Sequence, residues 1–117
     1  MSESGQFILQ SANDYLRQGW LDHGRSNETS AEEEFRKAIQ LGPGLIDAYY
    51  GLGLVLKAQG RGKEAIQIFE KALDLVQNDT ATEKVRMQML GRLIRGHINL
   101  LNSGDWNLEK EVWKHSI

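Results

Sequence analysis

The histidines are the first side chains of this sequence to consider for acid–base or metal chemistry. His23, His97 and His115 lie far apart, and no two of them have the i, i+4 spacing of a helical metal-ligand pair. His23 and His115 are expected near helix C-termini, where a cation is mildly favoured. The sequence therefore predicts no metal site and no cofactor.

An acidic run and two pairs of glycines also resemble parts of known motifs. The run Glu32–Glu34 fits the first turn of a helix, where carboxylates are favoured. The glycine pairs, Gly51/Gly53 and Gly60/Gly62, lack the preceding strand and the lysine of a phosphate-binding loop. Because no cysteine and no Ser/His/Asp set is present, we expect a protein that is not an enzyme.

Composition limits the classes of partner. The 117 residues suit one domain, and the net charge of −2 gives no overall attraction to nucleic acid. No apolar run reaches the roughly 20 residues of a membrane helix, and the first residues lack a basic signal region. We therefore expect a cytoplasmic protein without a membrane partner.

The elements that would position a site follow from an internal repeat. Both copies place apolar residues at i, i+3, i+4 and i+7, which predicts amphipathic helices. The copies are 34 residues apart: Ala31, Phe35, Lys37, Ala38, Ile39 and Leu41 correspond to Ala65, Phe69, Lys71, Ala72, Leu73 and Leu75.

The helices that precede these two are predicted to correspond at an offset of 36. This offset places two additional residues in the polar loop 26–30 and sets Arg17 in the place of the small Gly53. It pairs Leu16, Trp20, Gly24 and Arg25 with Leu52, Leu56, Gly60 and Arg61.

Residues 46–79 resemble a tetratricopeptide repeat. The pattern is Tyr49-x2-Leu52-Gly53-x2-Leu56, followed by Ala65-x3-Phe69 and Ala72. Pro43 occupies the family's inter-repeat position, and Gln77 stands there one repeat later. The resemblance implies an all-α, right-handed superhelix of antiparallel helix hairpins.

The predicted organisation is a single domain over residues 1–117 with about three repeats. A divergent repeat covers about 5–45, the best match is 46–79, and 80–117 forms an irregular or truncated third repeat or capping helices. Helices are expected at about 5–23, 30–41, 46–59, 62–76, 80–102 and 106–115. The third repeat is aligned at an offset of 44, which pairs Gly104 with Gly60 and His97 with Gly53.

The resemblance also implies a concave groove lined by the first helix of each hairpin. The predicted groove residues are Asp14 and Gln18 in the first hairpin, Asp47, Tyr50, Leu54 and Lys57 in the second, and Ile94 and Ile98 in the third. Two large apolar side chains, Tyr50 and Leu54, distinguish a binding groove from packing within the fold. If they line the groove they should bind a partner, whereas if they pack on a neighbouring helix they should stabilise the fold.

The predicted function is to bind a peptide or helix of a partner protein that carries apolar anchors and a basic flank. Some members of the family bind the C-terminal carboxylate of a partner with a clamp that needs asparagine at the position of Gly51. The glycine argues against this function here. One alternative is a self-associating scaffold, a homodimer or an array, joined through helix 80–102. A minor alternative is nucleic-acid binding by the basic stripe of Lys84, Gln88, Arg92 and Arg95.

Overall fold

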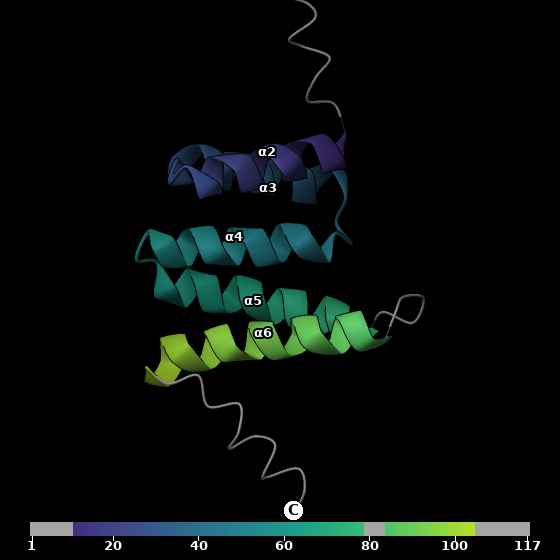
Figure 1. Cartoon of the computed structure of the whole chain (residues 1–117), viewed down its shortest axis with the longest axis vertical. Helices are drawn as coiled ribbons and strands as arrows, with labels where there is room; N and C mark the ends of the chain where they lie inside the picture. The colour runs from purple at the N-terminus through teal and green to yellow at the C-terminus, as the bar shows by residue number, and fades with distance from the viewer. Residues whose placement is uncertain (1–10, 79–83, 105–117) are drawn as a thin grey trace, which may run out of the picture.

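A computed structural model describes residues 11–78 and 84–104. These residues form five helices stacked in chain order (Figure 1) and contain no strand, so the prediction of an all-α fold is confirmed. The helices are α2 (Ala12–Gly24), α3 (Glu28–Leu41), α4 (Ile46–Ala58), α5 (Gly62–Asn78) and α6 (Lys84–Ser103). Their short connections join successive helices as hairpins, in agreement with tetratricopeptide-like packing.

Two phenylalanines form the centre of the core, one in each described hairpin. The side chain of Phe35 is fully buried between Gly19 of α2 and Gly51 of α4, where a Cβ atom would lie within 3 Å of the ring. Phe69 is fully buried against Gly53 in the same way. Glycine is required at these positions because the rings occupy the space of a side chain.

The first two hairpins correspond at an offset of 34 over their whole length, so the predicted offset of 36 for the first helix is wrong. Ser26 (φ 64°) and Gly60 (φ 77°) both adopt left-handed backbone after the first helix of their hairpin. In each hairpin the next amide donates to a carbonyl five residues earlier, Asn27 N to Asp22 O at 2.8 Å and its counterpart, Arg61 N, at 2.9 Å. The loop 26–30 therefore contains no insertion.

The corrected offset changes which side chains of α2 share the position of the predicted groove residues. Gly19, rather than Arg17, takes the place of Gly53, since each of the two glycines meets the phenylalanine of its own hairpin. Leu16 and Trp20 accordingly take the places of Tyr50 and Leu54.

At three places the helix boundaries differ from the prediction by more than one residue. The first described helix begins at Ala12, because Ser11, which lies inside the predicted helix, has extended backbone and caps α2 in a reciprocal pair of hydrogen bonds with Asp14. Helix α3 begins two residues earlier than predicted, at Glu28. Helix α5 continues to Asn78, so Gln77 lies inside a helix and is unlike Pro43 in its turn. Residues 5–10 and the predicted helix 106–115 lie outside the described residues.

Helix α6 is rotated relative to the prediction. Ile94 has no exposed surface and belongs to the core, and Ile98 packs partly buried against that core; neither lines the open cleft between α2, α4 and α6. Leu93 and His97 of α6 instead lie beside Tyr50 of α4: His97 contacts the Tyr50 hydroxyl, and Leu93 lines the same open cleft as Tyr50. Gly104 has a positive φ of 75° and matches Gly60 at the predicted offset of 44.

Candidate binding cleft

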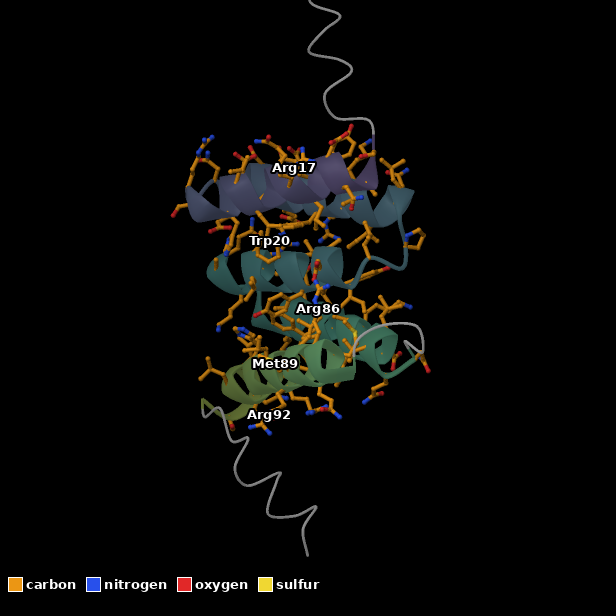
Figure 2. The ribbon with its side chains drawn as sticks, turned by 45° about the vertical axis from the view of Figure 1, so that its right-hand side comes forward. Arg17, Trp20, Arg86, Met89 and Arg92 are labelled. Atoms are coloured by element: carbon orange, nitrogen blue, oxygen red, sulfur yellow. The ribbon has the colours of Figure 1, made fainter. Side chains whose placement is uncertain are left out.

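An open cleft of about 480 Å³ lies between α2, α4 and α6. Its walls combine aromatic, aliphatic and charged side chains, three of which are labelled in Figure 2. The lining residues are Trp20, Asp47, Tyr50, Arg86, Met89, Leu90 and Leu93.

The aromatic wall of the cleft is fixed by the core behind it. The Trp20 ring contacts Phe35 edge-on at a centroid distance of 5.1 Å and lies 6.3 Å from the Tyr50 ring. The Tyr50 ring in turn lies 6.1 Å from Phe69. Because both phenylalanines are fully buried, Trp20 and Tyr50 are held in place before any ligand arrives.

The opposite wall is an exposed apolar surface on α6. Met89 is 62% exposed and Leu93 is 44% exposed. The other large hydrophobic side chains with comparable exposure in the described part of the chain, Leu21 at 47% and Leu41 at 50%, are not among the residues that line the cleft. Met89 and Leu93 therefore form an apolar surface that adjoins Trp20 and Tyr50.

An ion pair crosses the cleft between α4 and α6. The guanidinium Nη2 of Arg86 lies 3.5 Å from Oδ2 of Asp47, and both side chains are well exposed. An exposed pair of this length typically contributes less than about 1 kcal/mol to stability. Its charges therefore remain accessible to a ligand.

Beside the cleft, His97 of α6 contacts two side chains of α4. Lys57 Nζ lies 3.1 Å from Nδ1 of His97, and the Tyr50 hydroxyl lies 3.3 Å from Nε2. Burial, together with the charge of Lys57, lowers the pKa of His97 to about 4, so the ring is neutral near neutral pH. Since an ammonium group only donates, Nδ1 accepts from Lys57 and the protonated Nε2 donates to Tyr50. The His97 ring also stacks on Phe69 at 5.2 Å.

A pair of carboxyl groups joins α2 to α3. Asp22 is only 8% exposed and is hydrogen-bonded to Glu34, while Gln18 donates to Asp22 at 3.4 Å. At the offset of 34, Asp22 and Glu34 occupy the positions of Leu56 and Ile68 in the next hairpin. The first hairpin therefore has a polar pair where the second has an apolar one.

The two carboxyl groups of this pair have opposite pKa shifts. Burial, followed by the hydrogen bond and negative charge of Asp22, raises the pKa of Glu34 to about 7. The hydrogen bond from Glu34 is the main cause that lowers the pKa of Asp22. The proton therefore resides on Glu34, which donates to the Asp22 carboxylate.

We expect the Glu34→Gln variant to be more stable than the parent chain above pH 7, by about 1–2 kcal/mol. Because the pKa of Glu34 is higher in the folded protein than in the unfolded chain, its protonated form stabilises the fold. This contribution is complete below pH 4.5 and is lost as the pH rises from 4.5 to about 7. The glutamine amide donates to Asp22 at every pH. Urea unfolding from about pH 5 to about pH 8 should show a decline in the parent that is reduced in the variant; parallel profiles would contradict the assignment.

The structure brings only some of the predicted groove residues together. Asp47 and Tyr50 line the cleft, Lys57 adjoins it through His97, and Leu54 packs partly buried against the core. The two groove residues predicted on α2 do not line the cleft: Asp14 caps its helix, and Gln18 donates a hydrogen bond to Asp22.

The prediction missed most of the cleft's lining, namely Trp20, Arg86, Met89, Leu90 and Leu93. An alignment of the first helix at 34 would have identified Trp20, because it then occupies the position of Leu54. For α6 the sequence offered two adjacent apolar faces, and the prediction chose the one that is buried.

Neither a metal site nor a membrane-spanning segment is found in the parts of the chain that the structure describes. No group of three or more His, Cys, Asp or Glu side chains in these ranges could hold an ion. None of the described helices is both long and apolar enough to cross a bilayer.

Comparison with known proteins agrees with the repeat geometry. A family model described as tetratricopeptide repeat matches residues 25–85, just over half of the 117-residue chain. No curated protein and no solved structure matches the chain. The matched range covers α3, α4 and α5, the helices that carry both Ala–Phe–Ala motifs. The chain belongs to the tetratricopeptide repeat family.

Proposed function

We propose that this protein is a non-catalytic interaction module that binds a peptide or a helix of a partner protein in the cleft between α2, α4 and α6. Tetratricopeptide repeat domains are generally protein–protein interaction modules, and no catalytic family matches the chain. Apolar clefts with a few polar groups are the usual form of a recognition site.

The observation that supports this proposal most directly is the contrast between the two walls of the cleft. Trp20 and Tyr50 are held by buried rings, whereas Met89 and Leu93 expose much of their apolar surface to solvent. A partner side chain inserted between these walls would cover Met89 and Leu93 without any rearrangement of the aromatic wall. Rigid aromatic anchors of this kind contribute most to binding energy.

A homodimer joined through α6 is the second candidate, since Met89 and Leu93 would also be covered by another copy. The charges of α6 argue against it. This helix contains four Lys or Arg residues and no Asp or Glu, so a symmetric contact between two α6 helices would bring like charges together.

To test the proposal, random peptides of about 16 residues displayed on phage would be selected on the full chain. The Kd of recovered peptides would then be measured for two double variants. Met89→Ser with Leu93→Ser should weaken binding at least about tenfold, because both lose contact area in the cleft. The matched control, Leu21→Ser with Leu41→Ser, should change Kd by less than about twofold.

Melting temperatures provide the second control, because all four substituted side chains are exposed. Both double variants should melt close to the parent chain. Failure to recover any binding peptide would count against the proposed function. Equal weakening by the two double variants would instead place the binding surface elsewhere.

A further inference from the structure

The charge of α6 differs from that of the rest of the molecule. Its 20 residues contain Lys84, Arg86, Arg92 and Arg95 and no acidic residue, giving a formal charge of +4. The whole chain carries −2, so the remainder has a formal charge of −6. Helix α6, which contributes one wall of the cleft, is thus cationic in an otherwise acidic protein.

Cationic and apolar side chains alternate along one face of the molecule, which includes the cleft and extends beyond it on α2 and α6. Figure 2 shows Arg17, Trp20, Arg86, Met89 and Arg92 in a column that crosses the stacked helices from α2 to α6. The helical spacing supports this view, since Arg17 and Trp20 are three residues apart on α2, as are Met89 and Arg92 on α6. We refer to these five residues as the arginine band.

The arginines of this band retain hydrogen-bonding capacity toward a ligand. Arg17 contacts Asp14 through one nitrogen, Nη1, at 3.3 Å, and Arg86 contacts Asp47 only at 3.5 Å. Both guanidinium groups are more exposed than the carboxylates that they contact. A guanidinium has five N–H donors in a planar fork, so each can still bind a carboxylate.

We propose that the partner segment recognised by the cleft is acidic, with apolar side chains that contact Trp20 and Met89 and carboxylates that face Arg86 and Arg92. This inference rests on the proposed function and specifies its partner. It reverses the basic flank expected from the sequence, because the predicted groove residue Asp14 does not line the cleft and Asp47, which does, is paired with Arg86.

The chemistry of the band fits an acidic protein segment better than nucleic acid. The rings of Trp20 and Tyr50, the two aromatic side chains that line the cleft, are tilted by 49° at a centroid distance of 6.3 Å, so they do not form a parallel pair between which a base could stack. Met89 and Leu93 are aliphatic and offer contact area without stacking. An acidic segment with apolar anchors uses both the arginines and these side chains.

The test uses the peptides selected on the full chain. Their sequences should be enriched in Asp and Glu around large apolar residues, with a net negative charge relative to the unselected library. Arg86→Gln with Arg92→Gln should weaken their binding about tenfold at low salt and reduce its dependence on salt. The matched control, Lys63→Gln with Lys71→Gln, removes two exposed charges from α5 and should change Kd by less than about twofold.

The possible outcomes separate this inference from the proposed function. Neutral or basic peptides that bind the cleft would overturn the acidic partner and leave the interaction module intact. Equal effects of the α5 and α6 variants would show that attraction is not local to the arginine band, which also overturns it. Tighter binding of a single-stranded oligonucleotide than of any peptide, or a dimer that dissociates when Met89 and Leu93 become serine, would replace the acidic segment with nucleic acid or a second copy.

Discussion

Replacing Gly53 with alanine is expected to lower the free energy of unfolding by about 2 kcal/mol. The new Cβ atom would lie 2.4 Å from Cε1 of Phe69, closer than atoms of a packed core approach. Phe69 is fully buried and stacks on His97, so its ring has little room to move away. Overpacking typically destabilises by about 1–3 kcal/mol, and we take the upper end, offset by about 1 kcal/mol of improved helix propensity.

Gly24→Ala is the matched control, because Gly24 is also helical but a Cβ atom added to it would meet nothing within 4 Å. Its stability should stay equal or rise by up to about 1 kcal/mol. Phe69→Leu should make the Gly53→Ala substitution less harmful, which a double-mutant cycle of urea unfolding would measure. If Gly53→Ala unfolds at the same urea concentration as Gly24→Ala, the close approach of α4 to Phe69 is wrong.

The repeat of the second helices could be recognised from sequence because steric requirements fix their residue types. Alanine is needed where helices approach closely and phenylalanine where a ring fills the space between them. Ala31, Phe35 and Ala38 are fully buried, as are their counterparts 34 residues later. A position that tolerates only one size of side chain keeps that size in each repeat, which makes the spacing visible.

The first helix was misaligned because one of its core positions holds a polar residue where the second hairpin has an apolar one. The position of Leu56 is occupied by Asp22, and that of Ile68 by Glu34, so a hydrogen-bonded carboxyl pair replaces an apolar contact. An alignment that matches apolar residues avoids Asp22 and shifts by two residues to pair Trp20 with Leu56. Only the tertiary contact between the buried Asp22 and the partly buried Glu34 explains an aspartate at this position.

The face of α6 could not be assigned from its sequence for another reason. Leu90, Leu93, Ile94 and Ile98 lie on adjacent faces, and the apolar surface is wider than one contact requires. A one-residue shift of the alignment rotates the assigned face by about 100°. The buried face is the one that packs on α5, where Ile94 joins the core, and this depends on tertiary packing between the two helices.

The Tyr50→Ala variant is expected to lose about 3 kcal/mol of stability. Tyr50 is partly buried and contacts the rings of Trp20, Phe69 and His97, so its removal leaves a cavity where α2, α4 and α6 meet. Loss of a large aromatic side chain from a core typically costs about 3–5 kcal/mol, and partial exposure places Tyr50 at the lower end. Thermal and urea unfolding of the full chain would measure this effect.

Tyr50→Phe separates the ring from the hydroxyl group. It keeps the ring contacts and removes the hydroxyl that accepts from Nε2 of His97 at 3.3 Å, so we expect a loss of about 1 kcal/mol. Since Tyr50→Phe also preserves the aromatic wall, it should bind selected peptides within about twofold of the parent chain. If Tyr50→Ala instead melts like the parent chain and only its binding falls, Tyr50 is a ligand contact alone. The network that joins α2, α4 and α6 through its ring would then contribute nothing to the fold.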